Sequence, residues 1–410
     1  MEIQNKKIAD IRKDFAIFRE NKYTYLDNSA TSQRPGQVLS RVMEFYQKEN
    51  ANPFRGVYEL SEICTKEYED ARSKVASFVG AKSSSEIVFT RNASESLNLI
   101  AYSYGMENVS EGDEIIVCIS EHHSNFLPWK MIAEKKNANL IKLEVNDEGI
   151  VTEDALKSVI SDKTKIVAMA QVSNVFGNVN DIKTLVKIAH EHDAIFVCDG
   201  AQSVPHMPVD VTDLDVDFMA FSGHKMMAPM GIGALYGKQE ILEGMQPFLR
   251  GGEMIEIVHW DRVKYAQVPH KFEAGTVNTG GAVGLAAAID YINSIGFDFI
   301  MEQEKKLTKL AFEKMIEIPH VNIIGSKKSE GHEGILTFTI DGVHPHDVAS
   351  IFDSENICVR AGHHCAQPLM DFLGVGSTTR ASLAFYNTEE EVEKFIKCLS
   401  GIRGKMGYAE

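Results

Sequence analysis

A lysine in a glycine-flanked turn is the first residue in this sequence that could do chemistry. Lys225 lies in the segment SGHKMMAPMGIG, just after an apolar run that ends at Ser222. A lysine in a partly apolar turn can lose its proton and form a Schiff base with an aldehyde cofactor. Taken alone, a solvated loop lysine is the more common case. Here Ser222 and His224 shift the balance, because both could hydrogen-bond a phosphate group beside an imine at Lys225.

An aspartate at the end of another apolar run is the second candidate. Asp199 closes the run in FVCDGAQS, and Gln202 follows three residues later. A carboxylate in this place is the partner that a protonated pyridine nitrogen needs in order to act as an electron sink. A helix N-cap aspartate is an equally good interpretation of this segment alone, since Asp often caps helices. The lysine at the tip of the next strand favours the chemical interpretation.

Two further segments offer an anion site and an imidazole. In TRNASESLNL, the backbone N–H groups of Ala93 and Ser94, together with the Ser94 hydroxyl, would face an anion at the positive end of a helix. A plain capping pattern is the alternative. In SEHHSNFLPW, His122 follows the run DEIIVC and could stack on a flat cofactor ring and pass protons. Spacing alone does not rank His122 against His123.

One cysteine differs from the others in its surroundings. Cys365 lies in VRAGHHCAQPLM, directly after His363 and His364, in a loop between expected elements. Nearby imidazoles and an exposed loop favour the thiolate, which is the nucleophilic form of cysteine. The remaining cysteines lie in apolar periodic segments and are expected to be buried thiols: Cys64, Cys118, Cys198, Cys358 and Cys398.

Composition limits the classes of protein to which these residues can belong. The 410 residues are 44% hydrophobic and 24% charged, as in ordinary globular proteins. Acidic residues outnumber basic ones by 58 to 42, and the net charge of -16 disfavours nucleic acid as a partner. The N-terminal segment lacks the apolar run of a signal peptide, and no stretch approaches the roughly 18 apolar residues that span a bilayer. We therefore expect a cytoplasmic protein without a membrane partner.

The cysteine count leads to two further expectations. Six cysteines in a chain of this length, without an export signal, are typical of reduced thiols rather than of a disulfide framework. No two of them have C-x-x-C spacing, so the sequence predicts no metal site.

The chemical residues lie at the ends of alternating strands and helices. From about residue 60 to residue 280, short apolar runs alternate with segments of helical spacing such as 182–193, which is typical of βα units in a mostly parallel sheet. Seven strands are expected, at 86–90, 113–118, 139–145, 165–172, 194–199, 217–222 and 231–237. Function in such α/β sheets gathers at the carboxyl edge of the strands.

Beyond residue 280 the pattern changes to that of a smaller α+β domain. One long helix is expected from 284 to 318, then strands at 321–325, 334–340, 357–362 and near 378–385, with helices at 345–354 and 388–401. No Pro/Gly/Ser linker separates the two parts, so they are expected to pack closely. We predict three segments: an N-terminal segment (1–22) that packs with the small domain, a large domain (23–290), and a small C-terminal domain (291–410) that carries Cys365.

Taken together, the motifs resemble those of the cysteine desulfurases, and RAGHHCAQPLM followed by a C-terminal Arg is similar to the Suf-type, or group II, branch. The ordered set covers nearly the whole chain: YLDNSATSQRP, EHHSN, QVSNVFG, DGAQS, SGHK, FEAGT, HHCAQP and TRAS. Single members are weak, but the set is highly specific. The resemblance implies a fold-type I pyridoxal 5'-phosphate (PLP) enzyme, related to class V aminotransferases, that forms a homodimer with active sites built partly from the partner subunit.

The resemblance also implies roles for single residues. Lys225 would hold PLP, Asp199 would pair with the pyridine nitrogen, and Gln202 would touch the ring oxygen. The implied catalytic residues are Lys225, Cys365 and His122. The implied cofactor-binding residues are Ala93, Ser94, His122, Asn174, Asp199, Gln202, Ser222, His224, Lys225 and, from the neighbouring subunit, Thr276. The implied substrate-binding residues are Asn28, Ala30, Asn174, Arg360 and Arg380. Among these, Arg380 is the expected clamp for the cysteine carboxylate, since a guanidinium can pair with it bidentately.

The implied reaction takes sulfur from free L-cysteine and leaves L-alanine. Lys225 would remove the Cα proton while PLP stores the electrons, and the Cys365 thiolate would then attack the substrate sulfur, with His122 as proton carrier. A persulfide would remain on Cys365, and in the family this sulfur passes to an acceptor protein that serves Fe–S cluster assembly.

Three alternatives stay open. Selenocysteine lyases use the same apparatus, and another fold-type I activity, such as an aminotransferase or a β-lyase, would not need the persulfide. A catalytically silent PLP-binding scaffold that docks Fe–S assembly factors is the third. The intact set of Lys225, Asp199 and Cys365 argues against the scaffold.

A few positions depart from the family's pattern. Phe54 and Tyr58 stand where relatives usually carry histidines around RGV, and Asn92 stands where glycine is common. Ser94 replaces the usual threonine but keeps the hydroxyl, so phosphate binding is expected to survive. The replaced histidines change the polarity expected at the entrance of the site.

Overall fold

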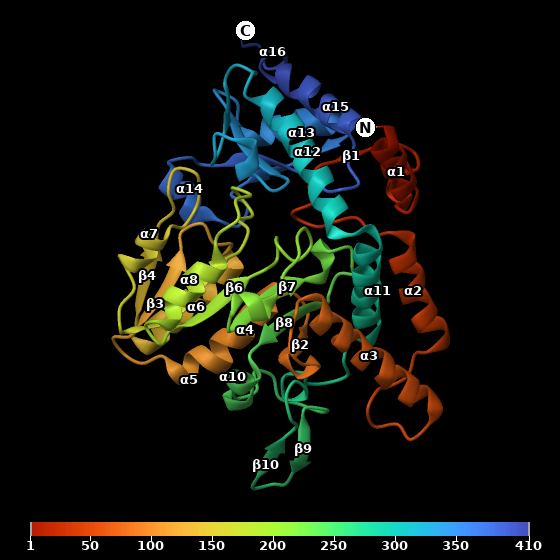
Figure 1. The fold of residues 1–410 in the computed structure, drawn as a ribbon, viewed down its shortest axis with the longest axis vertical. Helices are drawn as coiled ribbons and strands as arrows, with labels where there is room; N and C mark the ends of the chain where they lie inside the picture. Colours follow the sequence, from red (N-terminus) through yellow and green to blue (C-terminus); the bar gives the residue numbers. More distant parts are fainter. Residues whose placement is uncertain (1, 409–410) are drawn as a thin grey trace.

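The computed structural model describes residues 2–408, with side chains from residue 7 onward. Residue 1 and residues 409–410, the outermost ends of the first and third predicted segments, lie outside the described residues. Two α/β units follow one another along the long axis of the molecule, with the larger one below and the smaller, C-terminal one above it (Figure 1).

A seven-stranded sheet forms the centre of the larger unit, in the order β2-β8-β7-β6-β5-β3-β4. Its strands are β2 (Ile87–Thr90), β3 (Glu114–Cys118), β4 (Asn139–Leu143), β5 (Thr164–Ala170), β6 (Ile195–Asp199), β7 (Phe218–Ser222) and β8 (Gly233–Gly237). β8 is antiparallel to both of its neighbours, and the other pairs in the sheet are parallel. Each strand overlaps its predicted range. The predicted mostly parallel seven-stranded sheet is thus confirmed.

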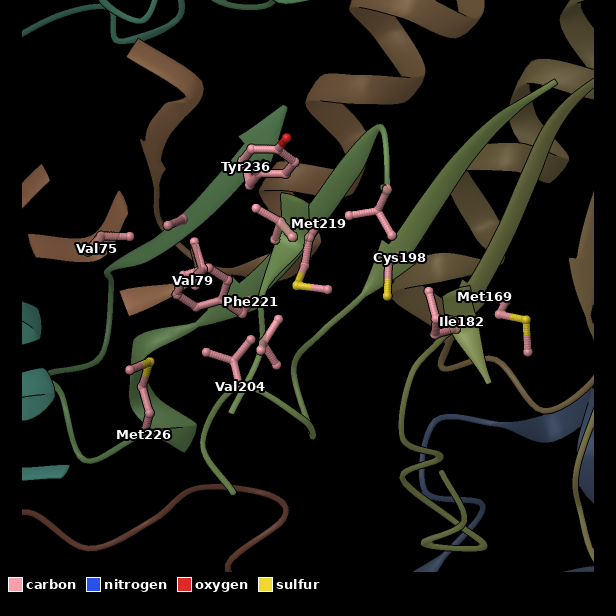
Figure 2. Close-up of a cluster of buried hydrophobic side chains, with 14 of the residues drawn as sticks. Val75, Val79, Met169, Ile182, Cys198, Val204, Met219, Phe221, Met226 and Tyr236 are labelled. Atoms are coloured by element: carbon pink, nitrogen blue, oxygen red, sulfur yellow. The ribbon is translucent and has the colours of Figure 1, made fainter. Parts of the chain in front are cut away.

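Both faces of this sheet are buried, which explains why its strands are continuous apolar runs in the sequence. One face carries Met169, Cys198, Met219, Phe221 and Tyr236, which pack against Val75 and Ile182 from helices (Figure 2). The other face carries Ala168, Val197, Ala220 and Leu235. The two sets come from successive sequence positions of the same strands, because successive side chains of a strand point to opposite faces.

Helices cover both faces of the large sheet. The first face is covered mainly by α2 (Gly36–Lys48), α3 (Glu59–Phe78), α8 (Ile182–His190) and α11 (Thr279–Ile295). The second face is covered by α4 (Ala93–Ile100), α6 (Leu127–Lys136) and α10 (Gln239–Gly244). No single helix in residues 2–408 has the length and apolar composition to cross a membrane, and α11 with α12 (Phe297–Met315) has them only as a bent pair.

The single long helix predicted for 284–318 is wrong. α11 ends at Ile295, and a separate helix, α12 (Phe297–Met315), begins at an angle of 76° to it. Gly296 lies between them with φ +84° and ψ 137°, a backbone conformation that residues with a Cβ rarely adopt. The break lets the chain leave the large unit along α11 and enter the small unit along α12.

The small unit contains an antiparallel sheet in the order β11-β12-β15-β14. Its strands are β11 (Val321–Ile323), β12 (Ile335–Ile340), β14 (Arg360–Gly362) and β15 (Thr378–Ser382). Its other helices are α13 (Pro345–Ser354), α14 (Gln367–Leu373), α15 (Glu389–Ser400) and α16 (Ile402–Lys405). The strand predicted at 357–362 is interrupted at Val359: its first half, β13 (Ile357–Cys358), leaves this sheet and pairs in parallel with β1 (Thr24–Tyr25).

The N-terminal segment contacts the C-terminal part of the chain. It comprises α1 (Glu2–Lys13) and a 3-10 turn at Ala16–Phe18. The Arg12 guanidinium donates to the carbonyl of Tyr386 at 2.8 Å and to the Glu391 carboxylate at 3.0 and 3.1 Å. The Phe15 ring lies 4.7 Å from that of Tyr386. The segment boundaries at residues 22 and 290 remain predictions.

A hairpin projects from the base of the large unit (Figure 1). It is formed by β9 (Ile255–Val258) and β10 (Val263–Tyr265), which pair with each other alone. Trp260, between the two strands, has an indole that is fully exposed in this chain. An exposed tryptophan at the tip of a projecting hairpin is typical of a contact with another surface.

Candidate active site

A cavity of about 270 Å³ lies where the carboxyl edge of the large sheet meets the small unit. It is lined by loops that follow β2, β3, β5, β6 and β7, and by β14, β15 and the loop before α14. The predicted site residues that line it are Ala30, Ala93, Ser94, His122, Asn174, Asp199, Gln202, Ser222, His224, Lys225, Arg360, Cys365 and Arg380. Segments from across the chain thus converge on one cavity.

Two predicted residues do not line this cavity. The Asn28 amide donates to the Ser382 carbonyl and to Asn387 Oδ1, and its Oδ1 accepts from the Tyr386 hydroxyl. Asn28 is therefore part of a buried hydrogen-bond network that holds its neighbours in place, and its role toward the substrate remains a prediction. Thr276 is exposed and lies outside the cavity of its own chain, so its role in the partner subunit's site remains a prediction.

Lys225 ends a short 3-10 turn that follows β7 directly. The turn is fixed from one side, since the His224 carbonyl accepts from the Ser32 N–H at 3.1 Å and the Thr31 hydroxyl at 3.0 Å. Burial lowers the pKa of Lys225 to about 8, against the opposing effect of the Asp199 carboxylate, and Arg380 lowers it further. A larger share of this amine is neutral near physiological pH than in an ordinary lysine, as Schiff-base chemistry requires.

Asp199 ends β6, and its carboxylate is buried. Burial raises the pKa of Asp199, and the positive Lys225 lowers it in part. Its Oδ1 accepts from the Ala201 N–H at 2.9 Å, but turns and not a helix follow, so the N-cap interpretation is wrong. Gln202 also lines the cavity: its Nε2 donates to the Ser29 carbonyl at 2.8 Å, and its buried Oε1 has no hydrogen-bond partner in the described part of the chain.

The anion end of the cavity is the start of α4. Asn92 caps this helix by accepting from the Glu95 N–H at 3.0 Å. The Ala93 N–H, predicted to face an anion, instead donates to Ser222 Oγ at 2.9 Å. Because Ser222 Oγ accepts there, its own proton is free to be donated to an anion. The Ser94 hydroxyl lies 2.6 Å from that of Ser124, at the same helix end.

His224, at the same end of the cavity, has a neutral imidazole. Burial lowers the pKa of His224 to about 4, and the nearby positive charges of Lys225 and Arg34 lower it further. A neutral imidazole can still donate one hydrogen bond to a phosphate oxygen.

The structure separates the roles of the two adjacent histidines. His122 lines the cavity, and its Nδ1 accepts from the Ser124 N–H at 3.1 Å, which leaves the proton of the neutral ring on Nε2. Burial lowers the pKa of His122 to about 3, with Lys225 adding to the effect. A neutral ring of this kind can lie against a flat cofactor. His123 does not line the cavity and contacts the Cys365 loop.

Glu121 was missed from the sequence, although it stands next to the histidine pair in EHHSN. Its buried carboxylate accepts from the Ala170 N–H at 2.8 Å and from the Asn125 amide at 2.6 Å. Burial raises the pKa of Glu121 to about 8. These bonds tie the loop after β3 to the end of β5 and so hold His122 at the sheet edge. The sequence signal that could have identified Glu121 is a charged residue shortly after an apolar strand.

Two arginines of the small unit face the cavity from neighbouring strands. Arg380 on β15 is buried, and its Nη1 donates to the Asn174 carbonyl at 2.8 Å. Burial lowers the pKa of Arg380 to about 10. Arg360, opposite it on β14, donates from Nε and Nη2 to the Asp27 carboxylate. Asp27 was not among the predicted residues, and no local pattern links it to a strand some 330 residues away.

Cys365 lies in the loop between β14 and α14, and its thiol is exposed. The preceding residue is held from two sides: the His364 carbonyl accepts from Asn174 Nδ2, and the His364 Nε2 lies 2.8 Å from Thr378 Oγ1. The prediction of buried thiols is confirmed for Cys64, Cys118, Cys198 and Cys398. It is wrong for Cys358, which is half-buried because β13 is an edge strand that pairs with β1 alone. Within residues 2–408, no group of three or more His, Cys, Asp or Glu side chains is arranged to hold a metal ion.

The donor set of the cavity fits PLP. Lys225 offers an amine of lowered pKa to an aldehyde, and the buried Asp199 offers a carboxylate to a pyridine nitrogen. The unpartnered Oε1 of Gln202 can accept from a ring hydroxyl. The Ser222 hydroxyl and the start of α4 suit a phosphate group, because a helix N-terminus favours negative charge.

Comparison with known proteins agrees with this assignment. Residues 24–395 match the model of the family described as aminotransferase class-V. The chain is 48% identical over 405 residues to a "Probable cysteine desulfurase" of Staphylococcus epidermidis RP62A, with 98% of each chain covered. It is 45% identical to a protein of the same description from Streptomyces coelicolor, with 97% of each covered.

A solved structure shows the same likeness. The apo cysteine desulfurase of Thermococcus onnurineus NA1 superposes with a TM-score of 0.93 at 45% identity, covering 97% of this chain and 98% of that one. The predicted resemblance to cysteine desulfurases is thereby confirmed over the length of the chain, and its assignment to the Suf-type branch stays a prediction. The chain belongs to the aminotransferase class-V family and has the α/β fold and the cofactor site of its PLP-dependent enzymes.

Proposed function

We propose that this chain is a cysteine desulfurase that converts L-cysteine to L-alanine and holds the sulfur as a persulfide on Cys365. The observation that carries the proposal is that Lys225, Arg380 and Cys365 line one cavity, although they come from the turn after β7, from β15 and from the loop before α14. An amine, a guanidinium and a thiol around one cavity match an amino acid that has a carboxylate and a sulfur-bearing side chain.

Each residue has a defined task around the substrate. Asp199, Gln202, Ser222 and His122 would hold PLP, which when bound supplies an electron sink for the bonds at Cα. Arg380 binds the substrate carboxylate, because its buried Nε has no hydrogen-bond partner among the residues that the structure describes. Lys225, whose pKa is lowered to about 8, takes the Cα proton and later returns a proton to carbon.

The sulfur step belongs to Cys365. Its thiolate attacks the substrate sulfur, so that an S–S bond forms on Cys365 while the bond between Cβ and that sulfur breaks and its electron pair stays with the carbon side. The carbon side then takes up a proton and leaves as alanine. His122 lies in the same cavity, and its neutral ring carries a proton on Nε2. His122 is therefore the proposed donor of this proton. Exposure of the Cys365 thiol supports delivery of the sulfur to another protein.

The proposal extends to the assembly in which the enzyme works. We propose a cytoplasmic homodimer of the Suf type that passes sulfur to an acceptor protein for Fe–S cluster assembly. The exposed Thr276, the exposed Trp260 of the β9–β10 hairpin, and the exposed Leu39 and Met43 on α2 support a second copy against the large unit. Thr276 would then complete the phosphate end of the partner's cavity.

The test compares three proteins loaded with PLP: the wild type, Cys365→Ala, and Cys358→Ala as the matched control. Sulfide and alanine are measured after addition of L-cysteine and a reductant. We expect equal amounts of both products from the wild type and the control, and neither product from Cys365→Ala. Undiminished alanine release by Cys365→Ala would overturn the mechanism, and selective turnover of L-selenocysteine by the wild type would assign a selenocysteine lyase instead.

A further inference from the structure

His123 contacts the Cys365 loop at two points. Its backbone N–H donates to the carbonyl of Cys365 at 2.6 Å, and its ring Nε2 accepts from the N–H of Gln367 at 3.1 Å. The two bonds reach the main chain on the nucleophile and two residues beyond it. One residue of the large unit therefore spans the stretch that carries the thiol, while its neighbour His122 lines the cavity.

The stretch that His123 spans is conformationally demanding. His364 has φ +52° and Cys365 has φ +56°, so two successive residues with side chains are in the left-handed region. Such residues persist only where the surrounding contacts hold them. Asn174 Nδ2 supplies one contact, to the His364 carbonyl at 2.8 Å, and the two bonds to His123 lie on the other side of the thiol.

The protonation state of His123 agrees with its role as an acceptor. A ring nitrogen that accepts from a backbone N–H carries no proton, so the ring is neutral with its hydrogen on Nδ1. Burial lowers the pKa of His123, and the neighbouring His363 lowers it further.

We propose that His123 is a positioning residue that holds the Cys365 turn so that the thiol faces the cavity, through the bond from Gln367 N–H to its Nε2. The inference rests on the proposed function, since the position of Cys365 matters only if this thiol receives the sulfur. Removal of the acceptor would slow attack on the substrate sulfur without weakening binding of the substrate carboxylate at Arg380.

The test uses two substitutions of His123 and one matched control. His123→Leu removes the acceptor but keeps the backbone N–H, and His123→Gln supplies an amide oxygen near the place of Nε2. His344→Leu is the control, because the His344 Nδ1 also accepts from a backbone N–H, that of His346 at 3.2 Å, on an exposed helix start of the small unit. All proteins are PLP-loaded, and cofactor content is checked by absorbance.

We expect kcat for alanine release to fall by at least about tenfold in His123→Leu, because small displacements of a reacting group are costly, with KM for L-cysteine unchanged. His123→Gln should regain most of the lost kcat, and His344→Leu should match the wild type. A second measurement needs no turnover: amide hydrogen exchange at Gln367 should be faster in His123→Leu than in the wild type and His123→Gln.

The outcomes separate this inference from the proposed function. A wild type that releases no alanine contradicts the function, whatever the hydrogen exchange shows. An active wild type with unchanged kcat and unchanged Gln367 exchange in His123→Leu overturns the positioning role. A third outcome is that His123→Leu loses activity with a raised KM and that His123→Gln does not restore it. This result would assign His123 a general structural role and would also overturn the positioning role.

Discussion

Asp27 accepts two hydrogen bonds from Arg360, one from Nε at 3.1 Å and one from Nη2 at 2.9 Å. The same carboxylate lies 3.6 Å from Nη2 of Arg380. The fork of Arg360 is thus occupied by a carboxylate of the chain itself, whereas the buried Nε of Arg380 has no hydrogen-bond partner within residues 2–408. Two arginines that look alike in the sequence are therefore unequal in their capacity to bind a substrate carboxylate.

This difference predicts unequal effects of two conservative substitutions. Arg380→Lys should lower kcat/KM for L-cysteine roughly 10- to 100-fold, mainly through KM, since a hydrogen bond to a charged group contributes about 1.5–3 kcal/mol. Arg360→Lys should have a smaller effect on KM, because its guanidinium already pairs with Asp27. Steady-state kinetics of the two proteins decides the matter, and equal rises in KM would contradict the assignment of the clamp to Arg380.

The lowered pKa of Lys225 predicts how cofactor loading depends on pH. Only the neutral amine adds to an aldehyde, so the rate at which PLP binds the apoprotein should rise with pH through about 8 and level off above it. An ordinary lysine would give a rate that still rises toward pH 10, near its model-peptide pKa of about 10.4. The rate is followed by Schiff-base absorbance, with Lys225→Ala as the blank. A rate that climbs steadily past pH 9 would show that burial does not lower this pKa.

Much of the cavity could be predicted from the sequence, because it forms where buried strands end. β3, β6 and β7 are apolar on both faces, so the first polar residue after each marks the sheet edge. Asp199 ends β6, His122 and Lys225 follow β3 and β7 closely, and parallel strands bring their carboxyl ends to the same edge. Local pattern was therefore sufficient to group residues that lie about 100 positions apart.

Contacts between distant segments could not be predicted in this way. The pairing of Asp27 with Arg360, and the reach of His123 to Gln367, depend on how the small unit packs on the large one. The helix break at Gly296 could not be predicted for a different reason. A single glycine within a helical pattern is often tolerated, and nothing in the local sequence shows that its φ is positive. The role predicted for Thr276 concerns a second subunit, which one chain does not contain.

The break at Gly296 predicts a loss of stability on substitution. Gly296→Ala should lower the free energy of unfolding by roughly 1–3 kcal/mol, because alanine at φ +84° and ψ 137° is strained. An added Cβ would meet no atom within 4 Å, so the cost comes from the backbone and not from a clash. Urea unfolding followed by circular dichroism measures it. Gly404→Ala is the control, since that residue lies in α16 and also has open space around it; an equal loss in both would contradict the backbone explanation.

A buried ion pair between α3 and the segment that precedes Thr276 predicts a further loss of stability. The Glu273 carboxylate accepts from Arg72 at 2.6 and 2.8 Å, from the Tyr68 hydroxyl at 2.9 Å and from the Phe89 N–H at 2.7 Å. The side chains of Arg72 and Glu273 are 1% and 3% exposed. Glu273→Gln would remove the buried counter-charge of Arg72 and leave it paired only with the part-exposed Glu69, so it should cost about 1–3 kcal/mol of unfolding free energy.

The exposed pair of Lys66 and Asp70, on the same helix as Arg72, is the natural control. Its side chains are 73% and 57% exposed, so Asp70→Asn should cost less than about 1 kcal/mol. Glu273 also begins the loop that carries Thr276, three residues later, and the four bonds to its carboxylate anchor this loop to α3 and β2. If Thr276 serves the partner's phosphate end, Glu273→Gln should weaken PLP retention in the dimer as well as stability, and Asp70→Asn should change neither; a Glu273→Gln dimer that keeps PLP as firmly as the wild type would disconnect this loop from the cofactor.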